Sequence, residues 1–192
     1  MQARQAQALR DMRHWLERAV IGLNLCPFAK AVHVKGQVHY AACDAAAPAE
    51  ALEALGHEMD ALLAEDPARR DTTLLVLTGG FADFLEFQHL EAMAQRLLRK
   101  RRLDGVLQIA SFHPDFEFGD AAPDALSNFS NRAPWPTLHL LREDSVQRAV
   151  DAYPDAQAIY GANIATLERL GHEGWAALRV GRGDAPVDGE GA

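Results

Sequence analysis

The sequence predicts a single α/β (or α+β) domain with a mixed sheet of about four or five strands flanked by helices. Short apolar runs that resemble buried strands alternate along the chain with apolar residues at helical spacing. Such alternation implies right-handed crossovers and a partly parallel sheet. With 192 residues, nearly half of them apolar, the chain is long enough for one core and short for two. A ferredoxin-like two-layer sandwich is the nearest alternative.

The first predicted element is an amphipathic helix from about residue 3 to 23, because apolar side chains recur there at steps of three and four. Pro27 cannot continue this helix, so we expect it to end near Asn24. Apolar residues then alternate with polar ones around Gly36, which predicts a strand or a small hairpin. The alternating residues are Val32, Val34, Val38 and Tyr40.

The middle of the chain has clearer boundaries. Pro48 suits the first turn of a second helix, which should end before Asp66 and Pro67. A buried strand follows at 72–78, and Asp83 then caps a third helix. The later expected elements are a strand at 106–112, a loop, a strand at 137–141, a short helix capped by Asp144 or Ser145 that runs to Val150, and a last helix restarting at Pro154-Asp155. No helix of ordinary length separates those two strands, so we expect them to pair antiparallel.

The composition limits the classes of function. Asp and Glu outnumber Lys and Arg by 27 to 19, a formal charge of -8, which argues against nucleic-acid binding. The basic cluster at 99–102 ends a predicted helix, where cations complement the helix dipole. No apolar run is long enough to span a bilayer and no signal peptide is recognisable, so we expect a cytoplasmic protein without a membrane partner. The globular body should cover 1–179, with a flexible tail at 180–192.

The stretch 111–143 is the strongest candidate for a functional site. It leaves one predicted strand at His113 and enters the next after Asn131 and Arg132, whose neighbours include several prolines. A loop of this length inside a compact domain is uncommon and is usually functional or disordered. Gly79-Gly80 follows a second predicted strand, which we expect to be the neighbour of the first. If these strands are parallel, His113 and Gly79-Gly80 lie at one edge of the sheet, where ligands of α/β proteins bind.

Arginine and asparagine held in place by prolines suit a carboxylate or a phosphate. The expected function is therefore that of a small-molecule enzyme or binding protein with an anionic ligand, in which His113 could move a proton. Arg132 could instead tie the loop to acidic neighbours such as Asp115. The candidate ligand-binding residues are Asn128, Asn131, Arg132, Arg142 and Lys30.

Two other functions remain open. Cys26 and His113 could form the dyad of a cysteine-dependent hydrolase, although Cys26 follows a predicted helix C-terminus, which disfavours a thiolate. The aromatic residues of the loop could instead form a protein-interaction surface; they are Phe112, Phe116, Phe118, Phe129 and Trp135. No metal-binding motif is present, and no cofactor is predicted. The oligomeric state is left open.

Three segments of the chain resemble the family called domain of unknown function 1415. They are Asn24–Ala29, Ser111–Pro114 and Asn128–Glu143, of which the third is the most specific. The resemblance extends from the first predicted helix to the last. It implies a soluble bacterial protein of about this length, with no assigned activity and no catalytic residues to carry over.

Overall fold

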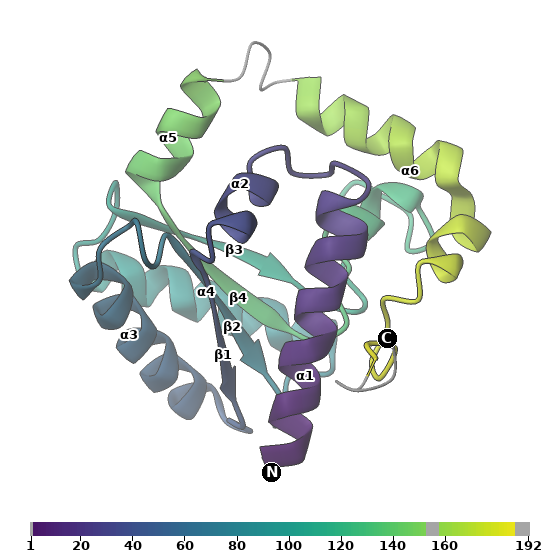
Figure 1. Cartoon of the computed structure of the whole chain (residues 1–192). Helices are drawn as coiled ribbons and strands as arrows, with labels where there is room; N and C mark the ends of the chain where they lie inside the picture. The colour runs from purple at the N-terminus through teal and green to yellow at the C-terminus, as the bar shows by residue number, and fades with distance from the viewer. Residues whose placement is uncertain (1, 153–157, 187–192) are drawn as a thin grey trace.

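The computed structural model describes residues 2–152 and 158–186. Figure 1 shows a central sheet with helices in front of it and behind it. In chain order the elements are α1 (Gln2–Trp15), η1 (Leu16–Ile21), α2 (Ala29–Val34), β1 (Val38–Cys43), α3 (Pro48–Ala64), β2 (Thr72–Leu77), α4 (Phe84–Lys100), β3 (Leu107–Phe112), η2 (Leu126–Ser130), β4 (Thr137–Arg142), α5 (Glu143–Asp151) and α6 (Ala158–Ala177). The mixed α/β fold with one sheet is confirmed.

The sheet has the order β1-β2-β4-β3 within the described residues. Strands β1 and β2 are parallel, with Val38 opposite Thr72. Strand β4 is antiparallel to both of its neighbours, and His139 lies opposite Leu74 on one side and Ala110 on the other. Strands β2 and β3 therefore run in the same direction but are not neighbours, because β4 lies between them. The antiparallel pairing of the last two strands is confirmed, and the expected neighbour relationship of β2 and β3 is wrong.

Helices cover both faces of the sheet, so the protein has three layers rather than the two of a ferredoxin-like sandwich (Figure 1). Behind the sheet, α3 and α4 bury a core to which β3 and β4 contribute only leucine and isoleucine. In front, α1 and η1 pack against Val76, Trp135 and Phe112 in a second core. The strand residues on this front face are more varied in size and polarity, as Gln108, Ala110 and His139 show.

The first helix does not keep α-helical geometry to its end. From Leu16 to Ile21 it widens into a π-helix, the element η1, which buries Leu16, Ala19 and Val20. A Cβ atom on Gly22 would lie 2.2 Å from the carbonyl oxygen of Arg18, so this turn requires glycine. Single π-helical turns inside α-helices are rare and are frequent at functional sites.

The expected strand or hairpin around Gly36 is wrong in its first half, because Val32 and Val34 lie in the short helix α2. Gly36 has φ of +69° and ends this helix. Its N–H donates to His33 O at 2.9 Å and the N–H of Gln37 donates to Val32 O at 3.0 Å, which is a Schellman motif. The glycine that interrupts the alternating pattern is therefore a helix cap.

The expected flexible tail from residue 180 needs correction. Val180 and Ala185 are buried, and the N–H of Gly183 donates to Asp11 Oδ2 at 3.0 Å. The globular body therefore extends at least to 186, and 187–192 lie outside the described residues. Helix α5 begins at Glu143, immediately after β4, rather than after a cap at Asp144 or Ser145. The expected restart of the last helix at 154–155 also lies outside the described residues.

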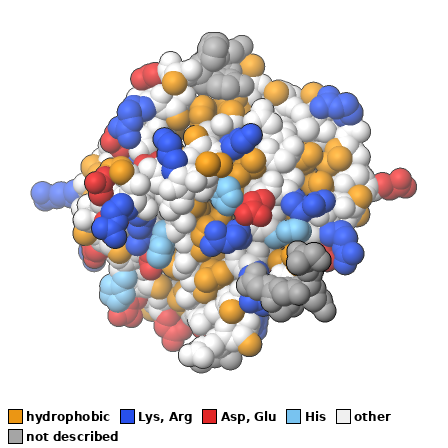
Figure 2. Space-filling view, in the orientation of Figure 1, with side chains coloured by type: hydrophobic (Ala, Val, Ile, Leu, Met, Phe, Trp, Pro, Cys, Tyr) orange, Lys and Arg blue, Asp and Glu red, His pale blue; other side chains and the backbone are white. Residues whose placement is uncertain are grey.

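The surface carries mixed charge. On the face shown in Figure 2, Lys and Arg side chains are interspersed with acidic ones instead of forming one patch. In the basic cluster, Arg101 donates to Gly56 O and to Asp60 Oδ2, both at 2.8 Å, and so joins α4 to α3. Within the ranges 2–152 and 158–186, no helix is both long and apolar enough to cross a membrane.

Candidate functional site

His113 lies at the end of β3 with no exposed surface. Its Nδ1 accepts from the N–H of Asp115 at 3.0 Å, so Nε2 carries the proton and donates to Phe81 O at 3.0 Å. The ring packs against Phe84 and Phe87 of α4, with centroids 5.2 Å apart in both cases. Burial lowers the pKa of His113, against smaller opposing contributions, the largest from the hydrogen bond to Phe81. His113 is therefore a neutral histidine that joins the turn after β2 to the loop after β3.

The two asparagines also hold the loop. Asn128 is fully buried; its Oδ1 accepts from the N–H of Phe118 at 3.0 Å, and its Nδ2 donates to Ala122 O at 2.9 Å. Asn131 donates from Nδ2 to Ser111 O at 3.2 Å and accepts at Oδ1 from Ser130. Both side-chain amides are thus used within 111–131. Binding of a ligand by either one stays a prediction.

Arg132 stabilises the loop through backbone carbonyl groups rather than through acidic side chains. Its Nε donates to Phe116 O at 3.2 Å and its Nη2 to Pro123 O at 2.6 Å. Its guanidinium group lies 4.5 Å above the ring of Phe129. The same side chain lines a surface pocket of about 430 Å³ together with Arg182. Arg132 therefore has a structural role, and it also lies beside a second cation.

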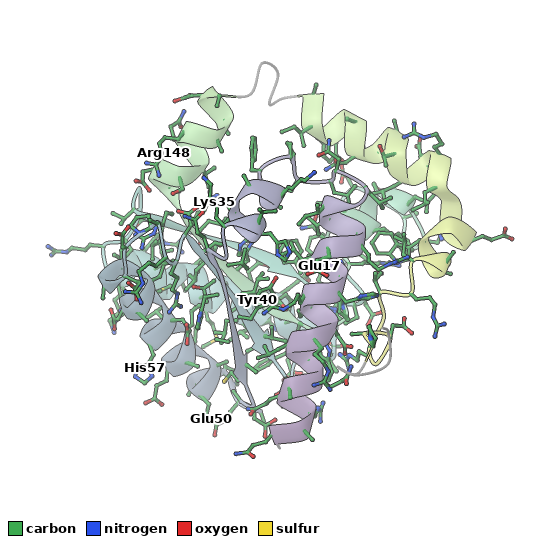
Figure 3. All side chains as sticks on the ribbon, in the orientation of Figure 1. Glu17, Lys35, Tyr40, Glu50, His57 and Arg148 are labelled. Carbon is green, nitrogen blue, oxygen red and sulfur yellow. The ribbon has the colours of Figure 1, made fainter. Side chains whose placement is uncertain are left out.

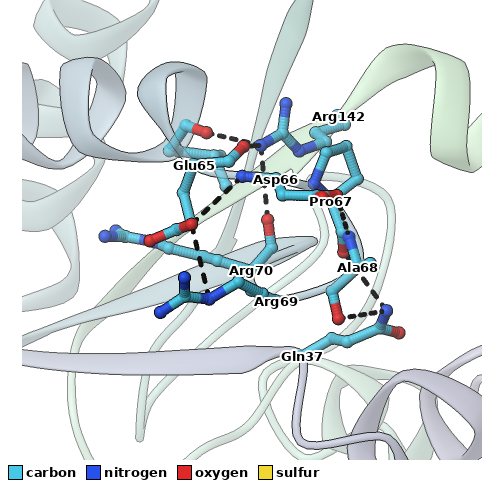
Figure 4. Close-up of polar contacts among 9 residues, drawn as sticks. Gln37, Glu65, Asp66, Pro67, Ala68, Arg69, Arg70 and Arg142 are labelled. Atoms are coloured by element: carbon cyan, nitrogen blue, oxygen red, sulfur yellow. Dashed lines mark hydrogen bonds and ion pairs between the residues drawn. The ribbon is translucent and has the colours of Figure 1, made fainter.

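Arg142 joins the end of β4 to the C-terminus of α3 (Figure 4). Its Nη2 donates to the carbonyl oxygens of Leu62, Glu65 and Arg70. Leu62 and Glu65 lie at the end of α3, where carbonyl groups have no partner within the helix, and Arg70 lies in the connection to β2. Lys30, in contrast, lies exposed on α2, away from 111–143 in the sequence. The structure does not bring these two cations together with His113 and Arg132 into one pocket.

Cys26 and His113 lie on opposite sides of the sheet. Cys26 packs against the front core with α1 and η1, whereas the ring of His113 packs against α4 behind the sheet. No described pocket is lined by both residues. Cys26 instead lines two pockets on the front side, which gives the thiol a partly accessible position. The structure does not assemble the dyad that a cysteine-dependent hydrolase would need.

The remaining candidates in the loop are engaged in packing. A Cβ atom on Gly79 would lie 2.2 Å from Asp44 O. The Gly79-Gly80 turn therefore needs glycine because its backbone packs directly against the end of β1. The loop aromatics pack in pairs: Phe116 contacts Phe118 with centroids 5.0 Å apart, and Phe129 contacts Trp175 at 5.1 Å. None of the loop aromatics is among the exposed large hydrophobic residues of the described chain. They do not form an exposed flat patch.

The front side of the sheet contains a cavity of about 330 Å³ that is partly open to solvent. Strands β2, β3 and β4 form its floor, and η1, α2 and α5 form its walls. Its surface is almost entirely apolar; the lining includes Trp15, Leu16, Val20, Ala110, Phe112 and Val146. Ligand sites commonly have volumes of about 300–1,000 Å³, mostly apolar walls and a few convergent polar groups. The cavity meets this description better than the loop.

His139 is the principal polar group on the cavity floor. Its Nε2 lies 2.6 Å from Thr72 Oγ1, and its ring lies 5.8 Å from that of Phe112, centroid to centroid. Burial lowers the pKa of His139 to about 4. The ring nevertheless keeps partial accessible surface, which lies along the cavity. His139 is therefore a neutral, deeply placed imidazole in contact with open space.

Sequence reasoning treated His139 as a packed histidine and did not find the cavity. One signal was present, because alternate positions of β3 and β4 carry Gln108, Ala110 and His139, whereas the positions between them, which face the core behind the sheet, are mostly leucine and isoleucine. Small and polar side chains on one face of a buried strand leave room that large apolar ones would fill. Among the described residues, no group of three or more His, Cys, Asp or Glu side chains could hold a metal ion.

Comparison with known proteins identifies a family. A family model described as "Protein of unknown function (DUF1415)" matches residues 7–177. No curated protein and no solved structure matches the chain. The matched range includes the whole cavity lining and the loop, but excludes Arg182.

Proposed function

The chain belongs to the DUF1415 family, a family of unknown function, and for this member we propose that it binds a small, mainly apolar molecule in the cavity at the front of the sheet. The observation that carries the proposal is an apolar space of about 330 Å³ beside a histidine ring that is not fully covered. The proposal concerns binding and does not include a reaction of the bound molecule.

The energetics of packing support an occupant. Protein interiors are close-packed, and voids larger than a water molecule are few. An engineered apolar cavity of about 150 Å³ stays dry and binds benzene, and the cavity here has a volume of about 330 Å³. Water would find few hydrogen-bond partners along such a wall, so an apolar molecule should bind by removing its own surface and the cavity wall from water.

Naphthalene is a suitable first probe because it is uncharged and larger than benzene. We expect it to raise the melting temperature of the wild-type protein, since binding to the native state alone stabilises that state. The Ala110→Phe variant should lose this shift because the new ring occupies the cavity. Ala61→Phe, an exposed position on α3, is the matched control and should keep the shift. An equal shift in all three proteins would contradict binding in the cavity.

The anionic ligand expected from the sequence is a second candidate, favoured by one observation. Arg132 and Arg182 line the same pocket, and neither forms a salt bridge within the described residues. Phe129 and Trp175 contribute aromatic walls, so benzoate is an appropriate probe. Titration calorimetry should show benzoate binding that Arg182→Gln abolishes and that Arg179→Gln leaves unchanged. Absence of binding to the wild-type protein would reject this candidate.

The remaining expectations stay predictions. A Cys26-dependent hydrolase requires rapid labelling of Cys26 by iodoacetamide near neutral pH in the native protein. A role of the loop aromatics in protein interaction requires that a partner protects them from solvent. The expected cytoplasmic location can be tested by cell fractionation.

A further inference from the structure

The polar groups along the cavity differ in whether they are free to meet a ligand. At the α5 end, Ser145 Oγ donates to Asp71 Oδ1 at 2.6 Å, and Arg142 donates to backbone carbonyls. Ser145 Oγ and Arg142 Nη2 are therefore already engaged, whereas Arg142 Nε is buried without a partner among the described residues. Gln108 and His139 lie on the floor of the cavity, and a glutamine amide can both donate and accept, so Gln108 does not select between ligands. Polar selectivity at the floor therefore depends on His139.

The hydroxyl group of Thr72 fixes the tautomer of His139. Thr72 Oγ1 lies 2.6 Å from Leu140 O and also 2.6 Å from His139 Nε2. The carbonyl oxygen cannot donate, so the hydroxyl proton must point to Leu140 O. The same oxygen then accepts from His139 Nε2–H. In the opposite arrangement, the hydroxyl and carbonyl oxygens would face each other at 2.6 Å with no proton between them.

Nδ1 is consequently the atom of His139 that carries a lone pair. Within the described residues it makes no hydrogen bond, and the accessible part of the ring lies along the cavity. Because burial lowers the pKa of the ring to about 4, it stays neutral at physiological pH and Nδ1 stays an acceptor. Beside Nδ1, an anion would meet an acceptor and an apolar wall, both of which disfavour it there.

We propose that the occupant of the cavity is an uncharged molecule with an aromatic body and one N–H or O–H group that donates to His139 Nδ1. This inference rests on the proposed function, since it names the class of ligand for the same cavity. The rings of Trp15 and Phe112 lie 5.0 Å apart in an edge-to-face arrangement and both line the space, which suits a planar aromatic body. The volume exceeds that needed for a single ring.

Indole and benzofuran form a matched pair of probes, because both are fused two-ring molecules and only indole has an N–H donor. Titration calorimetry should show that the wild-type protein binds indole about threefold to tenfold more tightly, the range expected for one net hydrogen bond. His139→Phe keeps an aromatic ring but removes the acceptor, so the two affinities should become equal. Thr72→Val keeps the histidine and its shape while freeing its tautomer. This variant should reduce the preference for indole without abolishing benzofuran binding.

The outcomes distinguish the inference about the hydrogen-bond donor from the proposed binding in the cavity. Equal affinities in the wild-type protein, or a preference for indole that survives in His139→Phe, would overturn the donor inference while leaving cavity binding intact. If neither probe binds and naphthalene gives no thermal shift, the proposed function fails together with this inference. Melting temperatures of both variants establish that they are folded at the temperature of titration.

Discussion

The indole Nε1–H of Trp135 donates to Asp11 Oδ2 at 3.0 Å, a buried bond between residues 124 positions apart. Asp11 is only 1% exposed, and the same oxygen accepts from the N–H of Gly183 while Oδ1 accepts from Gln7. One carboxylate therefore joins the first helix, the end of the long loop and the C-terminal segment. A buried charge is stable only when it is hydrogen-bonded in this way.

Replacement of Asp11 by alanine should lower the free energy of unfolding by about 2–4 kcal/mol, because the buried N–H of Trp135 and the partly buried N–H of Gly183 lose their acceptor. Urea unfolding followed by tryptophan fluorescence would measure the loss. Asp124→Ala, at an exposed position in the loop, should change the free energy by less than about 0.5 kcal/mol. Equal stabilities of the two variants would show that Asp11 does not hold these segments together.

Arg142→Met should destabilise the protein by about 2–3 kcal/mol, since the carbonyl oxygens of Leu62, Glu65 and Arg70 lose their donor and methionine retains most of the apolar stem. Thermal unfolding would detect this as a decrease in melting temperature. The control is Arg148→Met on α5. Arg148 lies on the outward side of that helix and pairs with Asp144 in solvent (Figure 3). Exposed pairs of this kind contribute little, so the control should resemble the wild-type protein.

Stability should fall as the pH is lowered from about 6.5 towards 4. Burial lowers the pKa of His139 from 6.5 to about 4, so the unfolded chain takes up a proton in this range and the folded protein does not. Stability is therefore fully present above pH 6.5, and the His139 contribution to its loss at pH 5 is about 2 kcal/mol. The lowered pKa of His113 acts in the same direction.

Urea unfolding at pH 7.5 and pH 5.0 measures this dependence. His139→Phe should show a smaller decrease between the two values than the wild-type protein, because the titrating group is gone. Parallel decreases in the two proteins would mean that His139 is not held neutral by the fold.

Gly79→Ala should destabilise the protein by about 1–3 kcal/mol or more, because the added methyl group would overlap the carbonyl group of Asp44 at the end of β1. Gly119→Ala is the control, since a methyl group added there would meet nothing within 4 Å beyond its chain neighbours. Chemical denaturation of the two variants gives the comparison. If both are as stable as the wild-type protein, the turn after β2 must be able to move away from β1.

The sequence was sufficient for most of the fold but not for the region from 29 to 36. Buried strands such as β2 could be predicted because a run of six apolar or β-branched residues rarely forms another secondary structure. The alternating Val32 and Val34 resembled a strand, yet they form a helix because Gly36 can adopt the positive φ of a Schellman cap. The π-helical turn of η1 has no recognisable sequence signal, since it depends on how the widened turn packs against the sheet.

The candidate site was harder to predict than the fold. A side chain that holds a loop and one that binds a ligand are of the same residue types, and only the positions of nearby carbonyl groups distinguish them. Asn128 and Arg132 illustrate this point, because backbone partners far along the loop occupy their polar atoms. The cavity was not predictable because its volume is what remains after many side chains have packed, and no single residue encodes it.

The position of β4 between β2 and β3 has a consequence for synthesis of the chain. Strand β4 is the last of the described strands to leave the ribosome, so β2 and β3 are complete before the strand that joins them exists. Until residue 142 emerges, both strands have an unpaired edge that can pair with other nascent chains. A chain that stops before β4 therefore lacks more than its last strand, because β3 then has no partner in the sheet.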